Sequence, residues 1–361
     1  MTSWQQLLRF GKQHWLTICF IFGFVTDSVL LNRVDDLFDN LVLLAYVVLA
    51  TAALLLFYVG VAERGPVFLA RSLRRYAPTV MQYAFGGLLS GMLIFYGRSG
   101  DWLASAPFLL LIVVVIIGNE VISKRSDRLL YQLTLYFTGL FSYVVLIVPV
   151  LIGDMGIPIF ILSGLIALMV VTFVVQVLYR IIPNYVAAHI QSIIVTIGAV
   201  YVTFNVLYFT SLIPPIPLSL TELSIVQSVD ATAVGGLKQY RVTYEEQSWY
   251  RQLPFLTPVI HPTRNTIACF ARVYAPTKLS TKIYHRWEYK NSAGKWQEQS
   301  RIGYEIMGSN KNGYGGYTQI SSFFPGVWRC SVETERGQVL GRETVTVSTP
   351  SGPVVTKTQL Q

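Results

Sequence analysis

The sequence predicts a transmembrane bundle of about seven α-helices followed by an all-β antiparallel sandwich domain. Of 361 residues, 53% are hydrophobic and only 13% are charged, whereas soluble domains carry about 25% charged residues. The long apolar runs lie in the first part of the chain, and after it hydrophobic residues alternate with polar ones, as in β-strands. The predicted organisation is a helical domain at 1–212, a proline-rich junction at 213–218, a β-sandwich at 219–348 and a disordered tail at 349–361.

Six apolar runs are long enough to cross the hydrocarbon core of a bilayer, which takes about 20 helical residues. None has a charged residue in its interior, and a soluble protein could not bury six such segments. A seventh run, Trp15–Leu31, is interrupted by Asp27, which leaves open whether it spans fully. The six are Leu41–Ala62, Thr79–Gly97, Trp102–Gly118, Leu129–Ile152, Ile157–Tyr179 and Ala187–Leu212.

Positive charge alternates between the segments that flank these runs. Counting the N-terminal segment as the first, the odd segments hold ten Lys and Arg residues and the even ones two. The most basic segments include Arg71–Arg75 and Lys124–Arg128. Because basic residues near span ends stay in the cytoplasm, the pattern predicts a cytoplasmic N-terminus and a C-terminal domain on the other side of the membrane.

Asp27 is the intramembrane polar candidate of the helical half. Ionisable groups within spans are energetically costly and mark functional sites by default. Asp27 is either a hydrogen-bonded helix-end residue or a water-exposed kink, or it is part of a proton or ion relay. The G-x-x-x-G sequence Gly87–Gly91 favours close helix packing.

The junction Ile213–Leu218 holds three prolines, which end the last helix and predict a short, stiff, extended connector. Strand-type segments rich in β-branched and aromatic residues follow, separated by turn residues. Seven or eight such strands favour an antiparallel sandwich. The predicted strands are Leu223–Asp230, Gln239–Glu245, Thr266–Tyr274, Thr281–Tyr289, Lys295–Ile306, Tyr314–Ser321, Val327–Thr334 and Val339–Val347.

Strand alternation places Cys269 and Cys330 on core-facing sides, together with Trp328. In an oxidising compartment the two cysteines could form a disulfide. Two buried thiols are the alternative, since sequence does not give the Cα separation that a disulfide requires. Arg329 and Glu333 are expected on the outward side of the same strand.

Motifs of catalysis and of metal or cofactor binding are not found in the sequence. The four histidines are too far apart for a zinc spacing, and no C-x-x-C, G-x-S-x-G, phosphate-loop or dinucleotide fingerprint occurs. We therefore expect no catalytic residues, no metal and no cofactor. Glu288, Glu298 and Glu305 could form an acid–base pair, but solvated ion pairs explain them more simply.

Aromatic and basic residues are concentrated between residues 284 and 317. Trp287 and Trp328 are assigned to the core, and His285 is expected to be a buried histidine. Rings interleaved with arginines can stack on sugars or hold anions. The ligand-binding candidates are Tyr284, Arg286, Arg301, Tyr304, Tyr314 and Tyr317.

Several ordered motifs resemble a known family. They are Leu212–Leu220, Cys269–Val273, Tyr284–Trp287, Phe323–Arg329 and Gly337–Gly341. These are similar to bacterial polytopic inner-membrane proteins that end in a domain of unknown function (the DUF-2914 type). The resemblance implies a multi-pass protein of the bacterial inner membrane with a periplasmic C-terminal domain, and it implies no activity and no site residues.

Two functions from different classes follow as expectations. The first is a binding protein, more plausible here than an enzyme, whose periplasmic sandwich recognises an envelope glycan, a lipid head group or a protein partner. Its helical half, embedded in the lipid bilayer, acts as anchor or coupling element. The alternative is a polytopic transporter or membrane enzyme for lipid-linked or small substrates, with an accessory β-domain. Nucleic acid is not expected in that compartment.

Overall fold

The computed structural model describes residues 15–31, 36–64, 66–121, 129–234, 237–246, 257–276, 279–308, 313–349 and 353–360. The chain forms two compact units. One comprises Met1–Gly97 and Ser105–Ile213, and the other comprises Arg98–Ala104 and Pro214–Gln361. Of the basic residues counted above for orientation, Arg9, Lys12, Arg33 and Lys124–Arg128 lie outside the described residues.

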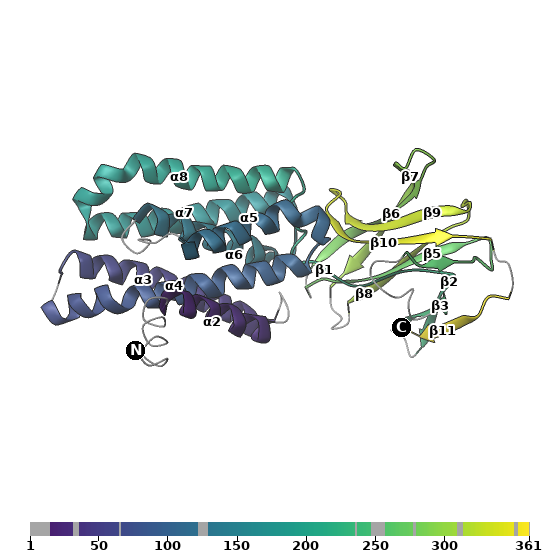
Figure 1. Ribbon diagram of the computed structural model, residues 1–361, viewed down its shortest axis with the longest axis horizontal. Coiled ribbons are helices and arrows are strands. Elements are labelled where there is room, and N and C mark those ends of the chain that lie inside the picture. Colours follow the sequence, from purple (N-terminus) through teal and green to yellow (C-terminus); the bar gives the residue numbers. More distant parts are fainter. Residues whose placement is uncertain are drawn as a thin grey trace, which may run out of the picture. The chain divides into compact units, whose positions relative to one another are not determined.

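The first unit is helical in its described part (Figure 1). Its helices agree closely with the predicted apolar runs, because uninterrupted apolar sequence of this length has few other folds available. They are α2 (Trp15–Leu30), α3 (Leu37–Val61), α4 (Val67–Arg98), α5 (Trp102–Val121), α6 (Leu129–Ile152), α7 (Ile157–Ile181) and α8 (Pro183–Phe209).

Five of these helices, α3, α4, α6, α7 and α8, are long and apolar enough to cross a membrane. By the same measure α2, with 16 residues, is too short, and the apolar stretch counted in α5 covers only Trp102–Ile116. One boundary differs from expectation. Helix α4 begins at Val67 and continues through Pro78, so Arg71–Arg75 is helical rather than part of a loop.

Glycines let the helices approach closely at the G-x-x-x-G sequence. A Cβ atom on Gly87 would lie 2.4 Å from the ring of Tyr46 on α3, and one on Gly91 would lie 2.7 Å from Leu43. Elsewhere in the bundle the ring of Phe141 stacks on Phe204 at 4.8 Å between centroids. The Gly87–Gly91 sequence therefore serves helix packing.

The second unit is rich in β-strands. The predicted strand at 223–230 is two strands separated at Gln227, and the short β4 was not predicted. The tail was expected to be disordered, but Thr356–Leu360 forms a strand paired with β3. The strands are β1 (Ser219–Val226), β2 (Ser228–Val234), β3 (Leu237–Glu245), β4 (Val259–Ile260), β5 (Ile267–Tyr274), β6 (Ser280–Lys290), β7 (Trp296–Met307), β8 (Tyr314–Ile320), β9 (Gly326–Thr334), β10 (Val339–Val347) and β11 (Thr356–Leu360).

The strands form three sheets rather than the two of a simple sandwich. Their orders are β1-β5-β8, β4-β10-β9-β6-β7 and β11-β3-β2. All pairings are antiparallel except β4 with β10, which is parallel. The expectation of a purely antiparallel sandwich is thus corrected in the number of sheets and in the parallel pairing of β4 with β10.

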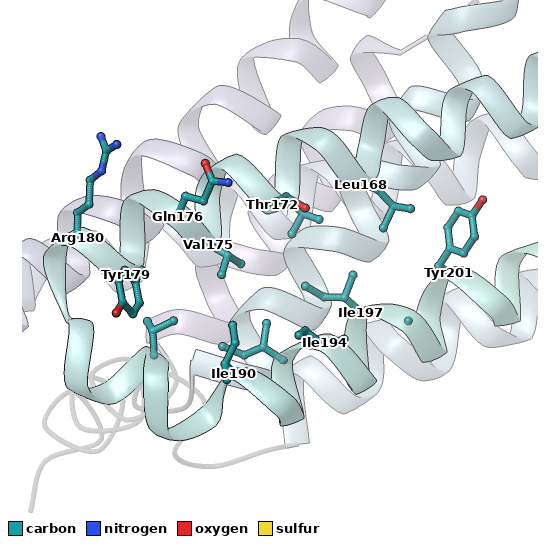
Figure 2. Close-up of a pocket in the computed structure, with 14 residues that line it drawn as sticks. Leu168, Thr172, Val175, Gln176, Tyr179, Arg180, Ile190, Ile194, Ile197 and Tyr201 are labelled. Atoms are coloured by element: carbon teal, nitrogen blue, oxygen red, sulfur yellow. The ribbon is translucent and has the colours of Figure 1, made fainter.

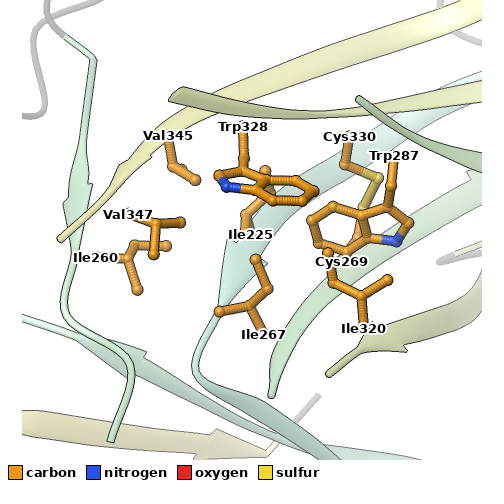
Figure 3. Packing of buried hydrophobic residues seen from close by; sticks show 10 residues of the cluster. All are labelled: Ile225, Ile260, Ile267, Cys269, Trp287, Ile320, Trp328, Cys330, Val345 and Val347. Carbon is orange, nitrogen blue, oxygen red and sulfur yellow. A yellow bond between two sulfur atoms is a disulfide. The ribbon is translucent and has the colours of Figure 1, made fainter. Parts of the chain in front are cut away.

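The three-stranded sheet β1-β5-β8 is the middle layer, because both of its faces pack in hydrophobic clusters. Ile267 and Cys269 of β5 pack with Trp287 and Trp328 of the five-stranded sheet (Figure 3). The alternate residues of β5, Ala268 and Phe270, point to the other face. They pack with Val229, Tyr240 and Val242 of the third sheet. Alternation in β5 therefore produces two apolar faces, as expected for a strand covered on both sides.

The junction is a turn rather than an extended connector. The Leu218 amide donates to the Pro215 carbonyl at 3.0 Å, and the Ile216 amide donates to the Pro214 carbonyl at 2.8 Å. The Ile216–Pro217 peptide bond is cis. Proline supplies the fixed φ that such turns use.

Candidate recognition surface on the five-stranded sheet

Strand β6 lies between β7 and β9, and its register brings charged and aromatic side chains onto one face of the sheet. Arg286 is opposite Arg301 of β7 and Ser331 of β9. Tyr284 is opposite Glu333. We call this surface the arginine–aromatic face; it consists of Tyr284, Arg286, Glu288, Trp296, Arg301, Arg329 and Glu333.

Two carboxylates lie beneath the arginines of this face. Arg301 donates from Nε to Glu333 Oε1 at 2.6 Å and from Nη2 to the carbonyls of Thr334 and Glu335. Arg329 donates from Nε and Nη2 to Glu288 Oε2 at 2.9 and 2.7 Å. Glu288 was expected in a solvated ion pair; instead both carboxylates are buried, and the guanidinium groups cover them. Hydrogen bonds to ions of this kind are stronger than neutral ones.

Arg286 is the least engaged arginine of the face. Its Nε lies 3.4 Å from Glu333 Oε2 and 3.8 Å from Glu288 Oε2. It donates no hydrogen bond to another residue of the described chain. The Arg286 side chain is 27% exposed and that of Glu333 only 3%, so the accessible layer of this face presents guanidinium rather than carboxylate.

Two aromatic rings complete the arginine–aromatic face. The guanidinium carbon of Arg301 lies 4.0 Å from the centroid of the Tyr284 ring. The guanidinium carbon of Arg329 lies 4.1 Å from the Trp296 ring. These cation–π contacts hold the arginines flat over the sheet, at about 0.5 to 1 kcal/mol each when exposed. Three arginines against two glutamates leave the face positive.

Tyr304, which was expected at the surface, points inward and belongs to a buried polar network. Its hydroxyl lies 2.9 Å from His285 Nε2, and His285 Nδ1 lies 3.0 Å from Thr318 Oγ1. Trp287 Nε1 donates to the same Thr318 oxygen at 3.0 Å. A Cβ atom at position 316 would lie 2.2 Å from the Tyr304 ring, so Gly316 makes room for it.

Burial sets the protonation of this network. Desolvation lowers the pKa of His285 from 6.5 to about 3 and raises the pKa of Tyr304 above its usual value. Both groups are therefore neutral at pH 7. His285 is a buried, hydrogen-bonded histidine, as its alternation with polar neighbours on the strand indicated.

Tyr314 and Tyr317 lie on β8, which belongs to the middle sheet. Tyr317 packs against Tyr240 with its ring centroid at 5.8 Å. The structure therefore brings together Tyr284, Arg286 and Arg301, and separates them from the other three candidates.

Cys269 and Cys330 form a disulfide that joins β5 to β9 across the core (Figure 3). With His285 they are a group of metal-ligand residue types within 4.8 Å of one another. Metals bind the thiolate form of cysteine, and here both sulfur atoms are bonded to each other. The group thus offers a single imidazole rather than a metal-ligand set.

Asp27 is fully buried in the helical unit and touches three helices. Its Oδ1 accepts a hydrogen bond from the Tyr46 hydroxyl of α3 at 2.7 Å, and its Oδ2 accepts one from the Ser90 hydroxyl of α4. Both carboxylate oxygens are occupied by neutral donors. This arrangement ties α2 to α3 and α4, in the manner of interhelical hydrogen bonds in membranes.

Comparison with known proteins places part of the β-rich unit in a family. Residues 280–347 match the family described as "Protein of unknown function (DUF2914)". The match begins with β6 and ends with β10, so it contains every residue of the arginine–aromatic face. It confirms the resemblance for the C-terminal region, while Leu212–Leu220 and Cys269–Val273 lie outside it.

No curated protein matches the sequence. Among solved structures, the chain is similar to the Pseudomonas fluorescens alkylpurine DNA glycosylase AlkC bound to DNA containing an abasic site analog. That similarity has 11% sequence identity, covers 88% of this chain and 100% of that chain, and has a TM-score of 0.21. A score this low carries no information about fold or function.

Proposed function

We propose that the protein is a membrane-anchored recognition protein whose β-rich domain binds an anionic glycan of the bacterial envelope through the arginine–aromatic face. The accessibility of Arg286 carries the proposal. Its guanidinium has five donors, makes no hydrogen bond within the described chain, and lies beside Arg301 and the Tyr284 ring. Such a guanidinium can donate two parallel hydrogen bonds to a carboxylate or phosphate, and the neighbouring ring can stack on the face of a sugar.

The proposal includes a location of the β-rich domain on the periplasmic side of the inner membrane. Positive charge in the odd segments favours an N-terminus in the cytoplasm. An envelope glycan would then meet the β-rich domain directly. Under this proposal the helical half is the anchor or the coupling element, and a disulfide fits the oxidising compartment.

A labelling experiment tests the location. Ser292 is exposed in the turn between β6 and β7, and Ser72 is exposed near the start of α4. In spheroplasts, a membrane-impermeant maleimide should label the Ser292→Cys variant and leave the Ser72→Cys variant unlabelled until lysis. Labelling of Ser72→Cys alone in unlysed cells would reverse the orientation.

A binding experiment tests the ligand. Full-length protein in nanodiscs of zwitterionic lipid is sedimented with purified cell-wall polymer at low and moderate salt. We expect retention that survives moderate salt. The Arg286→Gln variant should lose about tenfold in affinity, because a hydrogen bond to an ion contributes about 1.5 kcal/mol.

The matched control is Arg241→Gln, which removes one exposed positive charge from β3 of another sheet. If both variants lose affinity equally, retention reflects net charge rather than this face. If the folded wild-type protein is not retained at all, glycan binding is wrong. Binding of anionic lipid discs or of an envelope protein, abolished by the same Arg286→Gln change, would move recognition to the other two ligand classes.

The alternative function, a transporter or membrane enzyme, depends on Asp27. The contacts of Asp27 with Tyr46 and Ser90 favour a structural role in helix packing. The alternative would gain support if Asp27→Asn left the fold intact but abolished a proton-linked flux in proteoliposomes.

A further inference from the structure

An apolar groove runs between α7 and α8 of the helical unit. Its volume is about 630 Å³, within the range of roughly 300 to 1,000 Å³ typical of ligand sites. Figure 2 shows Val175, Ile194 and Ile197 along it, with Tyr179 and Arg180 at one end and Tyr201 toward the other. The middle part of the lining is mainly aliphatic, and α7 adds Thr172 and Gln176 to it.

The groove opens to the surroundings of the two helices. Ile194, which lines it, is 64% exposed, and Phe173 and Val195 on the same two helices are exposed to a similar degree. Both helices are long and apolar enough to cross a membrane, and in a membrane these exposed side chains would face lipid hydrocarbon. An acyl chain can therefore enter sideways from the bilayer.

The length of the groove corresponds to one leaflet. Leu168 and Arg180 on α7 both line it. Twelve residues of α-helix at about 1.5 Å each separate them by about 18 Å. Half of a hydrocarbon core about 30 Å thick is about 15 Å, so the groove matches a single acyl chain rather than a whole bilayer.

The end of the groove at Arg180 is basic. Arg64, which follows α3, donates from Nη2 to the Arg180 carbonyl at 2.8 Å, which brings a second guanidinium to this end. The first turns of α4 add Arg71, Arg74 and Arg75, of which Arg74 pairs with Glu63 at 3.3 Å. Basic pockets between membrane helices bind the head groups of anionic lipids.

We propose that the α7–α8 groove binds an anionic diacyl phospholipid from the leaflet at the basic end of the bundle. One acyl chain lies along Val175, Ile194 and Ile197. The phosphate lies at the helix ends near Arg180 and Arg64, whose guanidinium groups suit phosphate oxygens. The assignment does not depend on the orientation of the chain or on the function of the β-rich domain.

Gly198 offers a clean way to fill this groove. A Cβ atom built on Gly198 meets no other atom within 4 Å, and Gly198 lines the groove. A leucine side chain that starts in this open space would extend into the groove, and leucine is a better helix former than glycine. The Gly198→Leu variant is therefore expected to fold.

The experiment is native mass spectrometry of the full-length protein, delipidated in detergent and mixed with phosphatidylglycerol or with phosphatidylcholine of the same acyl chains. We expect wild-type protein to retain phosphatidylglycerol about fivefold more tightly. The Gly198→Leu variant should lose retention of both lipids by at least fivefold. The Arg180→Gln variant should lose about fivefold for phosphatidylglycerol, as expected for one basic residue near a lipid head group, and less for phosphatidylcholine, whose choline cation offsets the charge of its phosphate.

The controls are Val195→Leu, which adds bulk to α8 outside the groove, and Arg241→Gln, which removes an exposed positive charge from β3 of the β-rich unit. Both should bind as wild type does. Equal retention of the two lipids by wild type, or wild-type binding by Gly198→Leu, would overturn the proposal. A wild-type dimer that Gly198→Leu dissociates would also overturn it, because the occupant would then be a second copy of the chain.

Discussion

In the helical unit the buried carboxylate of Asp27 accepts hydrogen bonds from two neutral hydroxyls, whereas in the β-rich unit the buried carboxylate of Glu333 is paired with guanidinium groups. A helix bundle in a membrane has no water around it that could solvate an arginine partner of Asp27, so an arginine there would be costly. The Glu333 carboxylate lies under a sheet face that water reaches, where arginine can bury its stem and keep its donors wet. The difference shows that the surrounding solvent determines how each unit satisfies its interior polar groups.

The largest effect that separates the two units is expected from the disulfide. Replacing both Cys269 and Cys330 by alanine should lower the free energy of unfolding of the β-rich unit by about 4 kcal/mol, because the bond closes a loop of 61 residues. Hydrogen exchange of β6 and β9 in the full-length protein measures this, and the helices should be unaffected. The control is Cys19→Ala, which removes the remaining cysteine, in α2. Equal loss of protection in both units would show that they do not unfold independently.

Removing a buried carboxylate tests the charged arrangement. Glu333→Ala should cost about 3 kcal/mol, because Arg286 and Arg301 lose their common partner. Chemical denaturation followed by exchange in β9 reports the loss. Exposed Glu298→Ala on β7 is the control and should stay within about 0.5 kcal/mol of wild type. An unchanged Glu333→Ala protein would mean that the arginines are solvated well enough without it.

Acid and base each lower the stability of the β-rich unit, through different buried groups. Burial raises the pKa of Glu343 from 4.5 to about 7. Its contribution to stability is therefore full below pH 4.5 and is lost as the pH rises through 7. We expect a loss of about 2 kcal/mol by pH 8, given its partial exposure. His285, with its lowered pKa, contributes in full above pH 6.5 and loses its contribution as the pH falls toward 3.

The difference in unfolding free energy between wild type and Glu343→Gln, measured from pH 5 to 8, isolates the first of these contributions. The exposed Glu305→Gln variant is the control. A difference that does not change with pH would show that Glu343 ionises as it does in the unfolded chain.

The smallest effect is expected at Asp27. Asp27→Leu removes both acceptors and should cost about 1 kcal/mol, the usual size for interhelical hydrogen bonds in membranes. Asp27→Asn keeps an acceptor for Tyr46 and should cost less. Thermal unfolding of the full-length protein in detergent compares them with Asp154→Asn in an exposed turn. A large loss for Asp27→Asn would show that the charge itself is needed.

Part of the site was predictable from sequence. Alternation along 327–333 placed Trp328 inward and Arg329 outward, and the concentration of rings and arginines pointed to Tyr284, Arg286 and Arg301. The carboxylates pair with arginines of other strands, Glu288 with Arg329 at a separation of 41 residues and Glu333 with Arg301 at 32, and no local pattern relates them. Tyr304 was misplaced because the residue that admits its ring, Gly316, is on another strand.

By itself the sequence determined where the helices and most strands lie along the chain, and the burial of Trp287 and Trp328. Those features depend on hydrophobicity and period over 10 to 30 neighbouring residues, which are local properties of the chain. Only the tertiary structure decided the three-layer order, the strand at Thr356–Leu360, the close approach at Gly87 and the groove between α7 and α8. These depend on which surfaces meet, and a backbone edge or an apolar face can pair with many partners until the whole fold selects one.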